Sequence, residues 1–126
     1  MIADTTFLSD FHHEHERHWV GPARNFFAAH RKRPLRATVI SISELAVIFP
    51  SNQDARQFLG RFFTFKSVFP ELAYTAASID RELISIGRRL GENDNWIAAF
   101  CRYYGETLVS RDGDFDRVQG LRRRPY

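Results

Sequence analysis

Short apolar segments alternate with helical segments along the whole chain, and this alternation is the feature that most constrains the fold. β-Branched and apolar runs predict strands at residues 1–3, 37–41, 65–69, 107–109 and, at one edge, 121–123. Apolar spacing, caps and breakers predict helices at residues 5–11, 22–30, 43–49, 53–63, 70–90 and 94–104. Strands that are separated by helices form parallel sheets covered on both faces. The sequence therefore predicts a three-layer α/β/α protein, with one domain over residues 1–126.

The composition fits such a domain and excludes several other classes of protein. The 126 residues are 44% hydrophobic and 26% charged, which excludes a disordered chain. No segment approaches the roughly 20 apolar residues of a membrane span. Asp4 and Asp10 interrupt any N-terminal signal peptide, and the single cysteine, Cys101, allows no internal disulfide. We therefore expect a cytoplasmic protein in which Cys101 has a packing role.

Acidic residues follow the expected strands and are the first candidates for function. Asp4 ends the first strand, and Glu44 follows the second within one helical turn. Asp112 and Asp114 come just after the fourth strand, and Asp94 lies at a helix N-terminus. Any one of them could be only a cap or a turn residue. Ligands of parallel sheets, however, bind beyond the carboxyl ends of the strands, so we expect these acids to converge at one edge.

Converging carboxylates repel one another unless cations neutralise them, so the pattern predicts a Mg²⁺ or Mn²⁺ site with oxygen ligands. Such ions generate hydroxide, orient a phosphodiester and stabilise the leaving oxygen. A phosphoacceptor receiver domain is the main alternative from another class, because it also gathers acids and Mg²⁺ at one sheet edge. Receiver domains need a lysine after a late strand, and no lysine follows Lys66. The sequence therefore favours an acidic metal site of another kind.

Four blocks of sequence, taken in order, are similar to the motifs of one known protein family. Asp4-Thr5-Thr6-Phe7-Leu8 is similar to the opening Asp-Thr-Ser/Asn-apolar-Leu motif. In the second block, Thr38-Val39-Ile40-Ser41-Ile42-Ser43-Glu44-Leu45, a small hydroxyl residue precedes the Glu-Leu pair by six positions. Asn93-Asp94-Asn95-Trp96-Ile97-Ala98-Ala99 resembles the family's Asn-Asp-x-x-Ile-Ala-Ala helix start, which is the most specific of these matches. Leu108-Val109-Ser110-Arg111-Asp112-Gly113-Asp114-Phe115 resembles the last block, with Ser110 where threonine is commoner.

Together, the four blocks resemble the PIN-domain family and especially its VapC-type toxins. The resemblance implies a PIN-like (Rossmann-like) parallel sheet of about four or five strands and a Mg²⁺- or Mn²⁺-dependent endoribonuclease inhibited by a VapB-type antitoxin. A non-catalytic PIN-like module that binds RNA or protein is the alternative. The resemblance to the toxins implies four metal ligands: Asp4, Glu44, Asp94 and Asp112, with Asp114 as a competitor of Asp112. It also implies that the hydroxyls of Thr6 and Ser110 support this cluster.

Basic and aromatic residues suggest the partners. If four acids bind metal, eighteen basic residues face only eleven other acids, which favours contact with RNA phosphates. The Phe-rich region 49–69 is first a core signal, but Phe62 and Phe63 cannot both face one core from a helix. The surplus aromatics, with the resemblance, lead us to expect a homodimer or an antitoxin groove. The candidate RNA contacts are Arg31, Lys32, Arg33, Arg36, Arg122, Arg123 and Arg124.

Four histidines lie within residues 12–18, and their role is left open by the resemblance. Zn²⁺ would favour such ligands, and His15 and His18 would lie one turn apart in a helix. Glu14, Glu16 and Arg17 would make the stretch polar on all sides. We therefore expect a solvated loop or helix end here.

Overall fold

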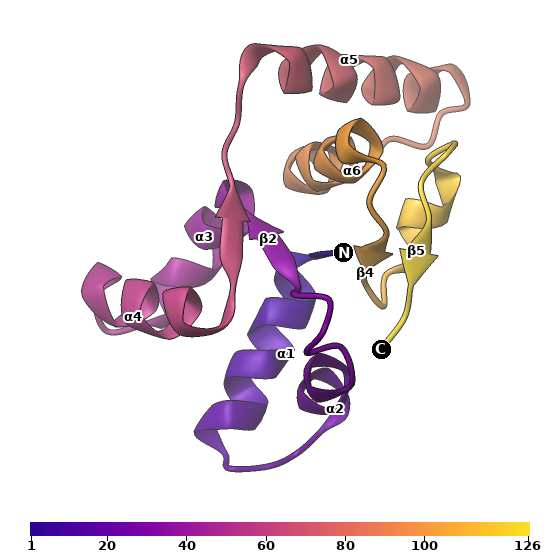
Figure 1. Cartoon of the computed structure of the whole chain (residues 1–126). Helices are drawn as coiled ribbons and strands as arrows, with labels where there is room; N and C mark the ends of the chain where they lie inside the picture. The colour runs from indigo at the N-terminus through magenta and orange to yellow at the C-terminus, as the bar shows by residue number, and fades with distance from the viewer.

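Five parallel strands form the central sheet of the computed structural model, which describes residues 1–126 (Figure 1). The strands are β1 (Ile2–Ala3), β2 (Arg36–Thr38), β3 (Thr64–Lys66), β4 (Leu108–Val109) and β5 (Arg123–Arg124). Their order is β3-β2-β1-β4-β5, and all neighbours are parallel, which confirms the predicted sheet. The order reverses between β1 and β4. In sheets of this kind, ligands bind beyond the carboxyl ends of the strands at such a reversal.

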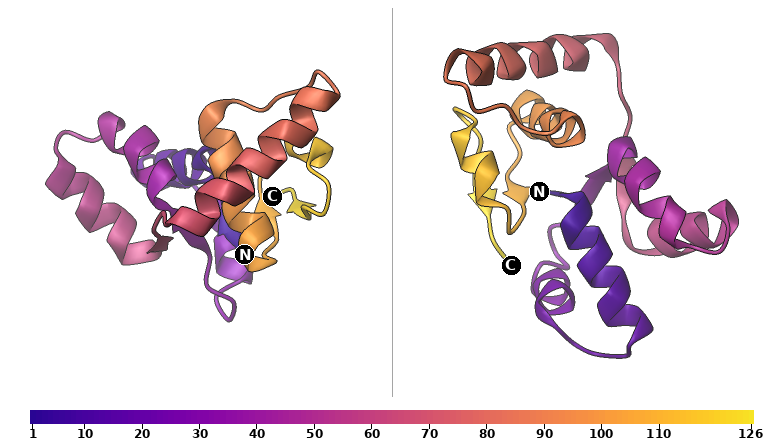
Figure 2. Two further views of the ribbon diagram at one scale, coloured as in Figure 1. Left: turned by 90° about the horizontal axis from the view of Figure 1, so that it is seen from above. Right: turned by 180° about the vertical axis from the view of Figure 1, so that it is seen from behind.

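Helices cover both faces of the sheet and give the molecule three layers (Figures 1 and 2). The pair α5 and α6 lies on one side of the sheet, and the pair α1 and α2 lies on the other. None of the six helices combines the length and the apolar character that a membrane span requires. The helices are α1 (Thr5–Glu16), α2 (Pro22–Ala29), α3 (Val39–Leu45), α4 (Asn52–Phe62), α5 (Pro70–Ser85) and α6 (Glu92–Tyr104), with 3₁₀ turns η1 (Ala46–Ile48) and η2 (Gly113–Arg117).

The two-residue strands each contribute one side chain to either face, because successive residues of a strand point to opposite sides. Ile2 and Leu108 are fully buried in the core between the sheet and the α5–α6 pair, which also contains Cys101. Ala3 and Val109 are fully buried in the core on the α1–α2 side. The central strands are therefore buried on both faces, as a parallel sheet requires.

Two predicted elements end earlier than expected because a capping group intervenes. The hydroxyl of Thr38 accepts a hydrogen bond from the Ser41 N–H (3.4 Å), so α3 begins at Val39 and the predicted strand 37–41 stops at Thr38. The predicted helix 70–90 stops at Ser85, because Gly87 takes a left-handed conformation with φ of 66°. Residues 86–90 are therefore a loop that leads to α6.

The prediction that residues 12–18 are solvated is wrong for two of the histidines. Helix α1 continues to Glu16 and turns His12 and His15 toward aromatic rings. The His12 ring lies 4.4 Å from that of Phe49, and the His15 ring lies 5.0 Å from that of Phe62. Burial lowers the pKa of both imidazoles. These two histidines therefore belong to the packing between α1 and α4.

The Phe-rich region packs internally more fully than the sequence indicates. Helix α4 ends at Phe62, and Phe63 is already extended, with φ of −128° and ψ of 150°. Both rings therefore contact the ring of Phe11, at centroid distances of 5.0 and 5.3 Å. The prediction that Phe62 and Phe63 cannot share one core is wrong, because it assumed that both lie in the helix.

Glu14, predicted to be solvated, is buried and caps the next helix. Its Oε1 accepts a hydrogen bond from the Ala23 N–H (3.0 Å), and its Oε2 accepts one from the Arg24 N–H (2.8 Å). A carboxylate at this place satisfies free N–H groups and the helix dipole of α2. Gly21 makes room for the cap, since a Cβ there would lie 2.5 Å from Glu14 Oε1.

We expect Glu14→Ala to lower the free energy of unfolding by about 2 kcal/mol, because it leaves two N–H groups near the core unsatisfied. Urea unfolding of the purified variant measures this loss. Glu16→Ala is the matched control on the same helix, since Glu16 is exposed and its one ion pair is with His12, at 3.9 Å. Equal stability of the two variants would contradict the capping role.

Candidate metal centre

Asp4 is a buried carboxylate at the carboxyl end of β1, with 3% of its surface exposed. Its Oδ1 accepts a hydrogen bond from the Phe7 N–H (2.7 Å) and so caps α1. Burial raises the pKa of Asp4 from 3.8 to about 6. The charges of Asp94 and Asp112 raise it further, while hydrogen bonds from Ser110 and Phe7 oppose the rise. Asp4 therefore lies within the electrostatic reach of two other acids.

Asp94 lies in the first turn of α6, but its carboxylate does not cap that helix. The N-cap residue is Gly91, and the helix has no side-chain capping hydrogen bond. Burial raises the pKa of Asp94, and the charges of Glu44, Asp112 and Asp114 raise it further. A role as a simple helix cap therefore does not account for Asp94, which faces other carboxylates.

Glu44 reaches the same region from α3 and is held by two hydrogen-bond donors. The Thr5 hydroxyl donates to Glu44 Oε2 (2.5 Å), and the Asn93 amide donates to Oε1 (2.9 Å). Thr6, the hydroxyl that the sequence assigned to this support, is exposed and is not bonded to the acids. Adjacent positions of a helix point in directions about 100° apart, so only one of the two threonines can face Glu44. Both Thr5 and Asn93 belong to the motif blocks, and their position in the first helical turn was the missed signal.

Asp112 and Asp114 have different surroundings, which separates the two candidates for the fourth acid. Asp112 lies at the start of η2, where its N–H donates to Ser110 Oγ (3.0 Å) and its Oδ1 accepts from the Asp114 N–H (2.8 Å). Asp114 forms an ion pair with Arg117. Of the two, Asp112 is the one whose charge raises the pKa of Asp4. Asp112 is therefore the better candidate, and the Ser110 hydroxyl forms hydrogen bonds with both the Asp112 N–H and the Asp4 carboxylate.

None of the four acids Asp4, Glu44, Asp94 and Asp112 forms a salt bridge with a basic side chain. An open pocket of about 280 Å³ lies beside two of them, lined by Glu44, Glu92, Asn93 and Asp94 together with Gly91. Oxygen donors without a cationic partner are the donor set that Mg²⁺ and Mn²⁺ prefer. No three carboxylates converge tightly enough to hold one ion in this conformation. The chemistry of the side chains fits a divalent cation, although the ligand sphere is not closed.

Most of the basic residues that were predicted to contact RNA lie at the opposite edge of the sheet. Arg36 begins β2 and forms an ion pair with Glu106 (2.6 Å), which precedes β4. Arg122 donates a hydrogen bond to the carbonyl oxygen of Gly105 (3.1 Å), at the same amino-terminal edge. The exposed residues that precede β2 share this location: Arg31, Lys32 and Arg33. These five residues lie beyond the amino ends of the strands, whereas the acids lie beyond the carboxyl ends.

The last two candidates lie at the carboxyl end of β5 but are engaged by other groups. Arg123 forms an ion pair with Asp116 (2.7 Å), and the guanidinium of Arg124 lies over the Phe26 ring at 5.6 Å. Neither side chain is a free cation beside the acids. The sequence therefore identified the basic residues but did not predict which of them lie beside the candidate metal centre.

A parallel sheet with unpaired carboxylates beyond β1 and β4 defines a class of small α/β proteins that carry an acidic site at one sheet edge. The sequence matches the PIN domain over residues 1–121, and the chain belongs to this family. This result confirms the resemblance carried by the four motif blocks. Comparison with proteins of curated function finds no significant match.

Solved structures of toxin–antitoxin complexes share the fold over nearly the whole chain. The chain matches VapBC2 from Rickettsia felis, bound to a promoter DNA fragment, with a TM-score of 0.80 and 17% identity over 99% of this chain and 97% of that one. It matches VapBC-1 from nontypeable Haemophilus influenzae with a TM-score of 0.79 and 17% identity, over 98% and 96% of the two chains. For DNA-bound VapBC from Salmonella typhimurium, the TM-score is 0.72 and the identity is 20%, over 98% and 96%. At these levels of sequence identity, the structural similarity to the VapBC complexes shows a shared fold and nothing further.

Proposed function

We propose that this protein is a VapC-type toxin: a Mg²⁺- or Mn²⁺-dependent endoribonuclease that hydrolyses RNA phosphodiester bonds in the cytoplasm and is inhibited by a VapB-type antitoxin. The observation that carries the proposal is the group of four carboxylates without basic partners beyond the ends of the central strands. The fold shared with VapBC complexes supports the assignment to toxins.

The proposed mechanism assigns a role to each side chain of the candidate metal centre. Divalent ions supply hydroxide and stabilise the leaving oxygen in phosphodiester hydrolysis. Glu44 is oriented by its two hydrogen-bond donors, and the Ser110 hydroxyl positions the loop after β4. No side-chain nucleophile is needed. The residues that would hold the ion are Asp4, Glu44, Asp94 and Asp112.

We expect the purified protein, freed of antitoxin, to cleave structured RNA in Mg²⁺ or Mn²⁺ and to stop when EDTA is added. The reason is that the acids repel both one another and the RNA phosphates until cations neutralise them. Gel analysis of end-labelled RNA measures the rate. Equal cleavage with and without EDTA would contradict metal dependence. Binding of RNA without cleavage under any of these conditions would instead favour the non-catalytic module.

The proposed antitoxin contact is an apolar groove between α3 and α4. The groove has a volume of about 530 Å³, and Ile42, Leu59 and Phe65 are among the residues that line it. Val47, at its rim, is 79% exposed, and the adjacent Ile48 is 46% exposed, so the groove continues into an exposed apolar surface of the kind that marks interaction sites. An amphipathic segment of a partner protein could bury these residues. A homodimer is proposed from the family resemblance alone, because most of the Phe-rich region lies inside the core.

A further inference from the structure

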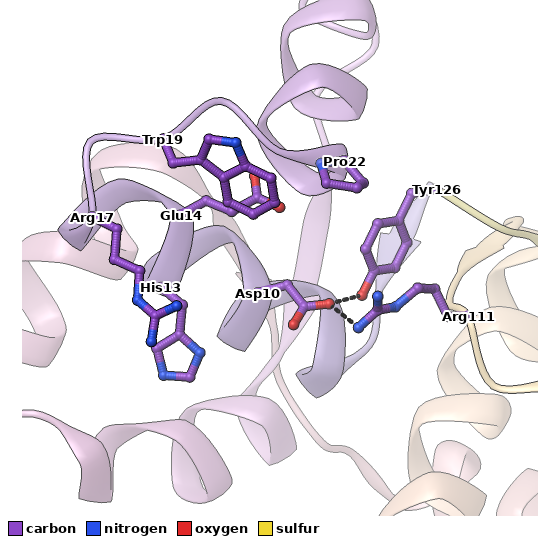
Figure 3. Close-up of a pocket in the computed structure, with 8 residues that line it drawn as sticks. All are labelled: Asp10, His13, Glu14, Arg17, Trp19, Pro22, Arg111 and Tyr126. Atoms are coloured by element: carbon purple, nitrogen blue, oxygen red, sulfur yellow. Dashed lines mark hydrogen bonds and ion pairs between the residues drawn. The ribbon is translucent and has the colours of Figure 1, made fainter.

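A second pocket lies on the α1 side of the molecule, beside the acidic edge of the sheet (Figure 3). It has a volume of about 270 Å³ and lies between α1, the loop before α2 and the segments that follow β4 and β5. Arg111 connects it to the candidate metal centre, since this residue stands between Ser110 and Asp112 in the chain. Tyr126 connects it as well, because the ring of Tyr126 packs on that of Phe7 at 4.7 Å, at the start of α1.

The two acids that line this pocket are already engaged by other groups of the protein. Asp10 Oδ2 accepts a hydrogen bond from the Tyr126 hydroxyl (2.6 Å) and forms an ion pair with Arg111. The Arg111 guanidinium also lies over the Tyr126 ring, at 5.1 Å from its centroid. Glu14 is occupied in capping α2. The charge of Asp10 is thus balanced by Arg111, and the carboxylate of Glu14 is turned toward the backbone N–H groups at the start of α2.

The opposite rim, in contrast, carries a cation that has no partner, Arg17. His13 and Arg17 are four positions apart on α1, so they share one face of the helix. Neither side chain takes part in a salt bridge or a side-chain hydrogen bond with the rest of the protein. Figure 3 shows both at the α1 rim of the pocket. A guanidinium that is free in this way has its planar set of donors available for a phosphate group.

Trp19 is held rigidly in the loop above the pocket while 57% of it remains exposed. Its backbone N–H donates to the Glu14 carbonyl oxygen (2.9 Å), and its backbone carbonyl oxygen accepts from the Arg24 guanidinium (3.0 Å). One edge of the indole packs so closely on Gly21 that a Cβ there would lie 2.7 Å from Trp19 Cζ3. The preceding residue, His18, has φ of 51°, a left-handed conformation that is costly outside glycine. A fixed and exposed indole offers a stacking surface at little further cost in conformational entropy.

We propose that this pocket binds a nucleotide of single-stranded RNA next to the phosphodiester that lies at the acids, a role that rests on the proposed function. The base stacks on Trp19, and a phosphate binds the free guanidinium of Arg17. Exposed aromatic rings beside free cations are the combination by which proteins bind single strands without sequence preference. The pocket thus supplies, beside the acids, the cation that the predicted basic residues do not place there.

The binding test uses a short fluorescein-labelled oligoadenylate and fluorescence anisotropy in EDTA, in the Asp94→Asn background, so that cleavage and metal binding do not contribute. We expect Trp19→Ala to weaken binding about tenfold and Trp19→Phe to retain most of the affinity, because phenylalanine keeps a stacking face. Arg17→Ala should weaken binding about threefold. It should also reduce the slope of log affinity against log salt concentration by about one, which corresponds to the loss of one phosphate contact. Tyr74→Ala is the matched control, since Tyr74 is a 75% exposed aromatic residue on α5.

A spectroscopic test reports on stacking directly. In Trp96→Phe, Trp19 is the sole tryptophan, and we expect oligoadenylate to quench its emission while a polyglutamate peptide of equal length does not. Unchanged emission at saturating RNA, or equal affinity of Trp19→Ala and the parent protein, would overturn the proposal. If the wild type cleaves RNA and Trp19→Ala binds and cleaves equally well, only the pocket proposal fails. If Trp19 binds RNA but no condition gives cleavage, the proposed function fails and the pocket proposal stands.

Discussion

Replacing Asp94 by asparagine is expected to slow RNA cleavage in Mg²⁺ by about a hundredfold to a thousandfold. The substitution keeps the shape of the side chain and removes one of the negative charges that face one another beyond the strands. Asp94 does not cap α6, so the fold should not depend on its charge. Its charge instead interacts with Glu44 and Asp112, which reach the site from α3 and from the loop after β4. The loss should therefore appear in the single-turnover cleavage rate and not in thermal stability.

Two further variants separate this effect from a general loss of surface charge. Asp80→Asn should cleave RNA at the wild-type rate, because Asp80 lies on α5 and pairs with Arg89 (2.7 Å). Asp114→Asn should slow cleavage only a few-fold, because Arg117 already neutralises this carboxylate. RNA binding by Asp94→Asn in EDTA should be as tight as that of the wild type or tighter, since a repulsive charge is gone. A wild-type cleavage rate in Asp94→Asn, or an equal loss in Asp80→Asn, would refute the assignment.

The location of the acids could be predicted from the sequence because it follows from two local patterns and one geometric rule. Asp4 directly follows a short apolar segment, and Asp112 follows another after two residues, which identifies both as residues beyond strand ends. The carboxyl ends of parallel strands meet at one edge of a sheet, whatever the packing of the helices. The order of the five strands was not predicted, because strands of two or three residues carry almost no pairing information.

The neighbours of the acids could not be predicted, because they depend on contacts between distant segments. Whether Thr5 or Thr6 faces Glu44 depends on the residue at which α1 begins, and a change of one residue would exchange them. Arg111 meets Asp10 across 101 positions of sequence, and nothing local indicates that pair. The basic runs were conspicuous in composition, yet their partners are set by strand register, as in the ion pair of Arg36 with Glu106.

Burial of the Asp4 charge predicts that Asp4→Asn stabilises the metal-free protein. The pKa of Asp4 rises from 3.8 in the unfolded chain to about 6 in the fold, a difference that corresponds to up to about 3 kcal/mol at neutral pH. Asparagine can keep the cap, because its amide oxygen can accept the hydrogen bond from the Phe7 N–H. We therefore expect the free energy of unfolding in EDTA near pH 8, measured by urea, to be higher for Asp4→Asn than for the wild type.

The higher stability of Asp4→Asn relative to the wild type should disappear on acidification. A carboxyl group whose pKa is raised by folding binds its proton more tightly in the native state, so wild-type stability rises as pH falls from about 6 toward 4. Asp80 and Asp116, whose pKa values are lowered by hydrogen bonds from arginines, act in the opposite direction at lower pH and equally in both proteins. The difference between wild type and Asp4→Asn therefore isolates Asp4. Mg²⁺ should likewise raise wild-type stability more than that of the variant, since bound cations relieve the same repulsion. If Asp4→Asn proves the less stable protein near pH 8 and the gap does not change on acidification, Asp4 is a structural cap whose charge the fold tolerates without cost.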